Sequence, residues 1–169
     1  MSRLPLRIRN SQADDLEALY QIDQICFPED IAFSRIELAF YLNHPQSIAW
    51  VAEGTAAGIL GFVLAHIENP ARAHVLTLDV VPQARQRRIG TSLMDALHRE
   101  LRKQKIEAIV LEVGVRNVPA QHLYDRLQYR YVRTLPGYYH GREDAYQLAR
   151  IVHAEAKPKI VRVRSKAHV

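Results

Sequence analysis

The stretch Val80-Val81-Pro82-Gln83-Ala84-Arg85-Gln86-Arg87-Arg88-Ile89-Gly90-Thr91-Ser92-Leu93-Met94 decides the fold, because it joins a strand pattern to a helix pattern. The mostly apolar run from Val75 to Val81 predicts a buried strand. Apolar residues then recur at helical spacing as far as Leu101, which predicts a helix through Lys105. The loop between strand and helix is polar and basic, and it ends at Gly90.

A loop that leads into a helix favours a phosphate group, because unpaired N–H groups and the positive end of the helix dipole meet there. Arg85, Arg87 and Arg88 add positive charge. The loop lacks the Lys-Ser/Thr pair of a nucleotide P-loop and the three glycines of a dinucleotide-binding loop. By itself the loop therefore fits a pyrophosphate site and, equally well, a solvated basic turn.

The composition predicts one globular domain. A chain of 169 residues is long enough for a full core. No apolar run approaches the ~20 residues that span a bilayer, and Met1 to Leu6 lacks the apolar centre of a secretory signal. Cys26 is the single cysteine, which excludes an internal disulfide, so we expect a cytoplasmic protein. Of the net charge of +5, five basic residues and Glu155 contribute +4 after position 154.

Strand and helix patterns alternate along the chain. Strands are expected over residues 6–9, 48–53, 59–67, 73–81, 106–113, 129–135 and 144–151, with residues 136–141 as the last loop. Capping boxes at Ser11–Asp14 and Ser34–Glu37 open two helices, the second with an apolar stripe of Ile36, Ala39 and Phe40. The second and third strands should form an antiparallel hairpin. The fourth and fifth, joined through the long helix, should be parallel neighbours.

The ordered motifs resemble the GCN5-related N-acetyltransferase superfamily. They are Val80-x-Pro82, Arg85-x-x-x-x-Gly90, Leu111-Glu112-Val113, Asn117-x-x-Ala120-x-x-Leu123-Tyr124-x-x-Leu127, Gly137-Tyr138-Tyr139 and Glu143-Asp144-Ala145. The resemblance covers residues 6–151. Within the superfamily, it is strongest to bacterial ribosomal-protein-alanine N-acetyltransferases and to eukaryotic catalytic subunits that acetylate protein N-termini.

The resemblance implies an α/β (α+β) fold with a mixed central sheet of about seven strands and helices on both faces. Its parallel fourth and fifth strands would be splayed around acetyl-CoA. Residues 1–152 would form this domain, and we expect residues 153–169 to be a basic, flexible tail.

The same resemblance implies roles for individual residues. Glu112 would be the general base, directly or through water, and Tyr124 the acid that protonates the departing CoA sulfur. Acetyl-CoA would contact Leu78, Asp79, Val80, Arg85, Gln86, Arg87, Arg88, Ile89, Gly90, Thr91 and Asn117. The acceptor groove would be lined by Phe27, Pro28, Tyr138 and Tyr139. Attack would be direct, in a ternary complex, and the acceptor would be a protein N-terminus, with ribosomal proteins among the candidates.

Elementary chemistry supports these roles. An α-amine titrates at ~8, against ~10.4 for lysine, so a protein N-terminus needs only modest help from a base. A strand carboxylate such as Glu112 suits that task, particularly if burial raises its pKa. A strand N–H at Val80 would stabilise the charge that develops on the carbonyl oxygen.

Each residue taken singly also has a structural explanation. Glu112 could pair with an arginine, Tyr124 could be core, and Asn117 could cap its helix. Two positions depart from the superfamily pattern, since Arg88 and Gln128 stand where glycine is usual.

Two further functions stay open. One is acetylation of a small-molecule amine or a lysine side chain. The other is a basic nucleic-acid-binding module built on the arginine loop and the tail, although we expect nucleic acid to bind at most weakly, through the tail. No membrane partner is expected. No metal is expected either, because the eight histidines lack the spacing of metal ligands.

Overall fold

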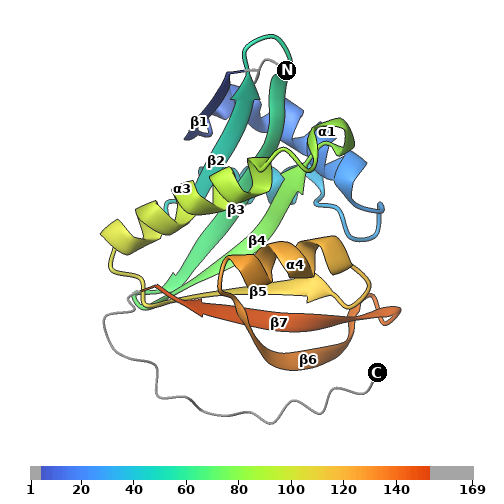
Figure 1. Cartoon of the computed structure of the whole chain (residues 1–169). Coiled ribbons are helices and arrows are strands. Elements are labelled where there is room, and N and C mark those ends of the chain that lie inside the picture. Colours follow the sequence, from blue (N-terminus) through green and yellow to red (C-terminus); the bar gives the residue numbers. More distant parts are fainter. Residues whose placement is uncertain (1–4, 153–169) are drawn as a thin grey trace.

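The computed structural model describes residues 5–152 (Figure 1). Its seven strands form one sheet in the order β1-β2-β3-β4-β5-β7-β6. They are β1 (Leu6–Asn10), β2 (Ser47–Gly54), β3 (Gly58–Asn69), β4 (Arg72–Val80), β5 (Ala108–Gly114), β6 (Arg130–Tyr139) and β7 (Glu143–Ile151). The helices are α1 (Leu16–Cys26), α2 (Arg35–Asn43), α3 (Ile89–Lys103) and α4 (Val118–Arg126), with 3-10 turns η1 (Ala13–Asp15) and η2 (Pro82–Ala84). The predicted α/β fold is confirmed, whereas the predicted tail, residues 153–169, lies outside the described residues.

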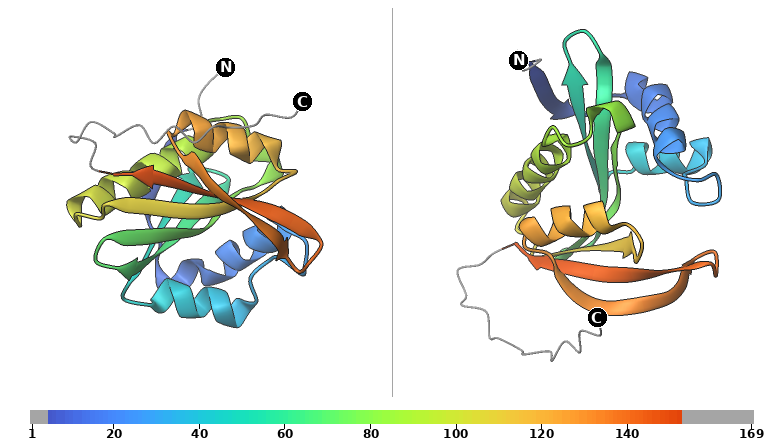
Figure 2. Two further views of the ribbon diagram at one scale, coloured as in Figure 1. Left: turned by 90° about the horizontal axis from the view of Figure 1, so that it is seen from below. Right: turned by 45° about the vertical axis from the view of Figure 1, so that its right-hand side comes forward.

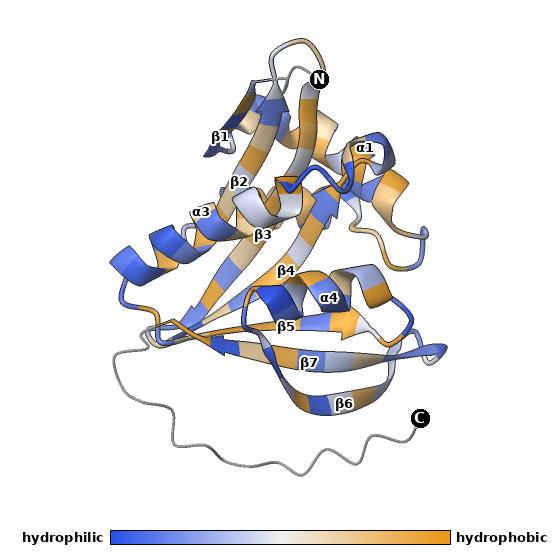
Figure 3. Ribbon diagram, viewed as in Figure 1, coloured by the Kyte–Doolittle hydropathy of each residue, from blue (hydrophilic) through white to orange (hydrophobic). Residues whose placement is uncertain are grey.

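Helices cover both faces of the sheet (Figure 2). On one face, α3 buries Leu93, Leu97 and Leu101 in the larger core. On the other face, α1 and α2 form a second core, to which Leu19 and Leu38 belong. Hydrophobic residues follow the central strands, while the C-terminal end of α3 is hydrophilic (Figure 3). Within residues 5–152, no helix combines the length and apolar character that crossing a membrane requires.

The sheet opens between β4 and β5. These strands are parallel, as predicted, but they pair only through residues 72–74 and 108–110. Just beyond this pairing, consecutive residues of β3 pair with Thr77 and Val75, so Leu76 is the extra residue of a β-bulge. A bulge bends its strand and strengthens the local twist. Beyond Leu76, β4 and β5 therefore diverge, and a gap opens in the middle of the sheet (Figure 1).

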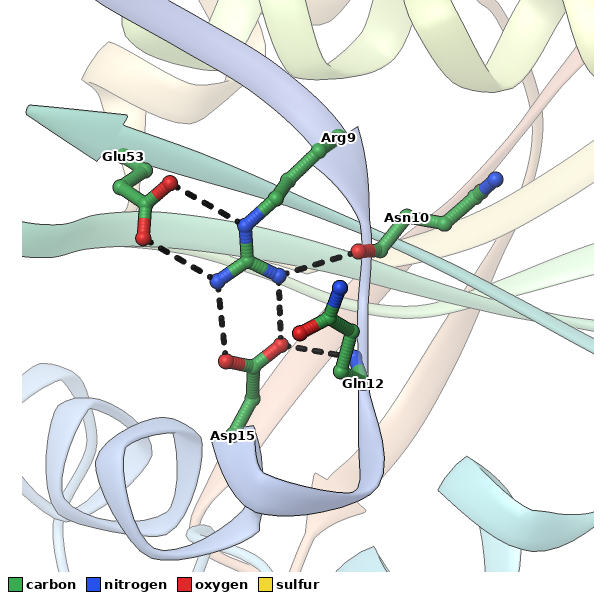
Figure 4. A network of polar contacts seen from close by, with 5 residues as sticks. All are labelled: Arg9, Asn10, Gln12, Asp15 and Glu53. Carbon is green, nitrogen blue, oxygen red and sulfur yellow. Dashed lines mark hydrogen bonds and ion pairs between the residues drawn. The ribbon is translucent and has the colours of Figure 1, made fainter.

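Arg9 on β1 fixes the entry to α1 (Figure 4). Its guanidinium donates to both carboxylate oxygens of Asp15 at 2.8 and 3.0 Å and to both of Glu53 at 3.2 and 3.3 Å. Asp15 also accepts from the backbone N–H of Gln12 at 2.7 Å. The predicted cap at Ser11–Asp14 was thus wrong by one residue, because Arg9 holds Asp15. The hydrogen bonds from Arg9 lower the pKa of Asp15 against the effect of burial, so this network loses stability in acid.

Two other local predictions had different outcomes. The capping box of α2 is confirmed, since Glu37 N donates to Ser34 Oγ at 3.2 Å. Its predicted apolar stripe is wrong, because Ile36 is 84% and Phe40 59% exposed, while Leu38 is fully buried. The last loop is also shorter than predicted, since β6 continues to Tyr139.

Both positions that replace a usual glycine adopt the left-handed conformation. Arg88, the N-cap of α3, has φ +62°, and Gln128, just after α4, has φ +67°. A side chain in this region costs about 1–2 kcal/mol relative to the ordinary helical conformation. Arg88 and Gln128 are therefore both held in a strained backbone conformation.

Replacing Gln128 with glycine should therefore stabilise the protein. We expect Gln128→Gly to raise the free energy of unfolding by about 0.5–1 kcal/mol, because relief of strain exceeds the entropy that glycine adds to the unfolded chain. Denaturant unfolding of both proteins measures this difference. The matched control is Gln83→Gly in η2, where φ is not positive, and it should lose stability. A loss of stability in Gln128→Gly as well would contradict the assignment of strain.

Candidate active site

The candidate site lies where β4 and β5 diverge. Beyond His74, the edge of β4 that faces β5 has no strand partner among residues 5–152, so its backbone groups are available to a ligand. The predicted residues Leu78, Asp79 and Val80 form this edge. Leu78 and Val80 pack toward the core beneath α3, whereas the side chain of Asp79 is buried on the α1 side.

Glu112 lies on β5 beside the gap, with only 8% of its side chain exposed. Its carboxylate accepts hydrogen bonds from His74 Nε2 at 2.5 Å, Gln147 Nε2 at 2.9 Å and the Tyr138 hydroxyl at 3.4 Å. Burial alone would raise the pKa of Glu112. These hydrogen bonds and the charge of His74 lower it by more, so the net pKa lies below its ordinary value. The rise in pKa that burial alone would cause is therefore outweighed, and Glu112 is an ionised acceptor.

His74 was not among the predicted site residues. It lies on β4 between two carboxylates, with Nδ1 3.2 Å from Glu68 and Nε2 2.5 Å from Glu112. Burial lowers the pKa of His74, yet both carboxylates raise it, and the net pKa lies above its ordinary value. A histidine inside an apolar strand was a visible signal. Its partner was not visible, because the contact depends on how β4 pairs with β5.

Tyr124 projects from α4 into the interior and is only 7% exposed. Burial raises the pKa of its hydroxyl, and the charges of Asp79 and Tyr139 raise it further. The hydroxyl therefore stays protonated at neutral pH and can act only as a proton donor there. The Tyr129 ring packs edge-on against the Tyr124 ring at a centroid distance of 5.6 Å, which fixes its orientation.

The basic loop presents an uncapped helix start. Within residues 5–152, no side chain caps α3, and its first turn holds no acidic residue, so no described side chain compensates its first N–H groups and the positive end of its dipole. The side chains of Gln86, Arg87 and Arg88 are exposed beside it. Arg85 differs from the other arginines, because its Nε donates to the Val80 carbonyl at 3.0 Å and ties the loop to the end of β4.

Gly90 lies in the first turn of α3, and Asn117 is the N-cap of α4. A Cβ built on Gly90 would lie 3.3 Å from Leu123 Cδ2 and 3.7 Å from Leu78 Cδ2, so glycine lets α3 begin close to both α4 and β4. Asn117 Oδ1 accepts from the N–H of Ala120 at 3.3 Å and caps α4. Ile89 is buried, and Thr91 is half-buried in the first turn of α3.

The predicted acceptor residues come from two segments. Phe27 and Pro28 follow α1, and Tyr138 and Tyr139 end β6, with their rings 5.0 Å apart at 88°. An exposed ion pair of 3.6 Å between Asp30 and Arg142 connects the loop after α1 with the β6–β7 turn. Because the Tyr138 hydroxyl also donates to Glu112, the tyrosine pair Tyr138 and Tyr139 lies next to the buried carboxylate.

Comparison with known proteins agrees with this architecture. A profile of the acetyltransferase (GNAT) family matches residues 16–129. The N-alpha-acetyltransferase of Saccharolobus solfataricus is 29% identical over 157 residues, which cover 85% of this chain and 91% of the relative.

Two solved structures are similar over most of their length. The ribosomal-protein-S18-alanine N-acetyltransferase from Escherichia coli has a TM-score of 0.81 and 22% identity, covering 90% of this chain and 97% of that chain, and this likeness concerns the fold alone. NAA60 from Arabidopsis thaliana, in complex with acetyl-CoA, has a TM-score of 0.77 and 26% identity, covering 87% and 98%. The chain therefore belongs to the acetyltransferase (GNAT) family and is an N-acetyltransferase.

Proposed function

We propose that this enzyme transfers the acetyl group of acetyl-CoA to the α-amine of a protein N-terminus. The observation that carries the proposal is that an uncapped basic helix start, a buried ionised carboxylate and a tyrosine-lined wall lie around one gap in the sheet. The 29% identical N-alpha-acetyltransferase supports the choice of acceptor, and the acetyl-CoA complex of a similar structure supports the choice of donor.

The residues of the gap fit acetyl-CoA. Its pyrophosphate would be held by the N–H groups that begin α3, with exposed Arg87 and Arg88 beside them. Its pantetheine arm would run along the open edge of β4 and hydrogen-bond to the backbone of residues 78–80. The thioester supplies the activated acyl group when it is bound. The other predicted contacts, with Arg85, Gln86 and Asn117, remain proposals: Arg85 would act mainly by holding the loop, and Asn117 by positioning α4.

The amine would attack the thioester carbonyl directly. A C–N bond forms, the C–S bond breaks, and the carbonyl oxygen would accept a hydrogen bond from the Val80 N–H during attack. Roughly a tenth of an α-amine with pKa ~8 is neutral at pH 7, so a strong base is not required beforehand. Glu112, directly or through water, would accept the proton that the nitrogen loses as the new bond forms, and Tyr124 would protonate the thiolate.

The acceptor would enter between Phe27-Pro28 and the tyrosine pair. The two rings of Tyr138 and Tyr139 offer flat apolar faces to the first side chains of a peptide, and the Tyr138 hydroxyl lies within reach of Glu112. In this arrangement an extended N-terminus brings its amine to the carboxylate.

Acetylation of a peptide panel tests this function. Incubation with acetyl-CoA and peptides that differ in their first two residues, some copied from ribosomal proteins, should acetylate free N-termini, as detected by mass spectrometry. N-terminally blocked peptides with internal lysines should stay unmodified. Modification of lysines alone, or of small amines alone, would refute the proposed acceptor. An absence of heat on mixing with acetyl-CoA, combined with salt-sensitive binding of RNA, would favour the nucleic-acid-binding alternative.

Replacing Tyr124 with phenylalanine should remove the acid. We expect Tyr124→Phe to lower kcat about 100-fold, the order of magnitude of general acid catalysis, while the Kd of acetyl-CoA changes little. Tyr129→Phe is the matched control, since this buried tyrosine hydrogen-bonds to His98 at 2.8 Å and lies outside the proposed chemistry. That control should lose stability and keep its turnover. Full turnover by Tyr124→Phe would exclude Tyr124 as the acid.

Neutralising His74 should shift the pH dependence. The pairing with His74 lowers the pKa of Glu112, so His74→Gln, which keeps a donor but loses the positive charge, should raise that pKa. The acidic limb of the kcat profile should then move to higher pH, because Glu112 must be ionised to accept a proton. Glu112→Gln should lower kcat about 100-fold. The exposed His122 provides the control His122→Gln, and an identical acidic limb in both histidine variants would contradict the assignment.

A further inference from the structure

Asp79 forms a buried carboxyl pair that the proposed chemistry does not use. Asp79 on β4 and Asp23 on α1 are each only 1% exposed, and their carboxyl groups lie within hydrogen-bonding reach of each other. Asp79 Oδ1 accepts from the Thr77 hydroxyl at 2.5 Å. No N–H or hydroxyl group of residues 5–152 donates to Asp79 Oδ2. Within the described residues, one oxygen of this buried carboxyl group therefore lacks a donor, and the neighbouring Asp23 could supply one only if one of the two carboxyl groups carries a proton.

Two carboxyl groups can share a hydrogen bond only if one of them carries a proton. Burial raises the pKa of Asp79 well above its ordinary value, and the charge of Asp23 raises it further. The other charged or titratable groups around the pair are Cys26 on α1, Arg85 after η2 and Tyr124 on α4. Only Arg85 among them favours ionisation of Asp79, and its side chain is exposed.

Asp23 connects this pair to the loop that follows α1. Its Oδ2 accepts from the backbone N–H of Phe33 at 2.6 Å. The neighbouring Gln24 donates from Nε2 to the carbonyl of Phe33 at 2.9 Å. Both backbone groups of Phe33 are thus held by α1. Residues 27–34, which include Phe27 and Pro28, are fixed at one end by the C-terminus of α1 and at the other by this clamp.

We propose that Asp79 and Asp23 share one proton, and that this hydrogen bond positions the acceptor loop, residues 27–34, relative to β4. The connection runs from Thr77 and Asp79 on β4, through Asp23 on α1, to the N–H of Phe33. Asp23 is then a positioning residue for the acceptor. The inference rests on the proposed function only in taking residues 27–34 as a wall of the acceptor site.

The proposal predicts how acceptor binding depends on pH. As the pH rises through the raised pKa of the pair, the shared proton leaves and two buried carboxylates repel each other. The acceptor loop should then lose its anchor, so the KM for the acceptor peptide should rise. The Kd of acetyl-CoA should change little over the same range, since the open edge of β4 binds through its backbone.

Two substitutions at Asp23 separate the shared proton from a general structural role. Asp23→Asn keeps an acceptor for Phe33 and offers an N–H to Asp79 without a titrating proton, so its KM should stay within about threefold of wild type at neutral pH and lose the alkaline rise. Asp23→Ala breaks the connection, so its KM should rise about tenfold at every pH, with kcat changed less. Asp95→Asn, on the exposed side of α3, is the control and should follow wild type.

Either of two kinetic results would overturn the proposal. If Asp23→Asn keeps the full alkaline rise in KM, the rise belongs to other groups. If Asp23→Asn raises KM at neutral pH as much as Asp23→Ala does, the charge of Asp23 acts directly and the shared proton has no role.

A measurement without substrate tests whether Asp79 and Asp23 share a proton, even if no peptide is acetylated. In the full-length protein, the carboxyl ¹³C signal of Asp79 should report a protonated group at neutral pH. As the pH is raised and that signal reports loss of the proton, the amide proton of Phe33 should shift together with it. Titration of both aspartates near ~4 would refute the shared proton. This result stands apart from the peptide panel, so a wrong acceptor and a wrong pair can be told apart.

Discussion

The extra residue in β4 is the feature on which the site depends. Side chains alternate between the two faces of a strand, so one inserted residue exchanges the faces of all that follow. Before the bulge, Val75 packs into the core beneath α3; after it, Leu78 does so and Asp79 faces α1. The same bulge coincides with the end of pairing to β5. One residue, Leu76, therefore both opens the ligand edge and directs a carboxyl group into the second core.

The protein compensates its buried acids in different ways. Asp15 is ionised because the bidentate hydrogen bonds of Arg9 outweigh the cost of burial. Glu112 is ionised because His74, itself supported by Glu68, faces it. Among residues 5–152, no cation contacts Asp79 directly, and in our proposal Asp79 avoids a buried charge by keeping a proton. Desolvation is common to all of them, so the partner alone decides which acid can accept a proton at neutral pH.

Local patterns of the sequence predicted the elements and several of their contacts, whereas the register and the irregularities of strand pairing could not be predicted. The βαβ crossover around α3 and the Ser34 cap follow from short-range rules, and both are confirmed. The bulge at Leu76 lies between Val75 and Thr77 in a mostly apolar run, and no glycine, proline or other turn residue marks it. The contact of His74 with Glu112 depends on how β4 and β5 are aligned, and it was missed for the same reason. In α2, periodicity located apolar positions but chose the wrong face, because Leu38, Tyr41 and Leu42 face the core instead.

Structural and chemical roles coincide at several positions of the site. Asn117 caps α4, and α4 in turn carries Tyr124, so the cap determines where the proposed acid lies. Gly90 allows close packing with Leu123, and a side chain there would push the start of α3 away from α4 and thus from the open edge of β4. Arg88 adopts a strained backbone conformation at the N-cap of that helix. A structural explanation for one of these residues therefore does not compete with a functional one, because the proposed chemistry needs the geometry that the structural contact creates.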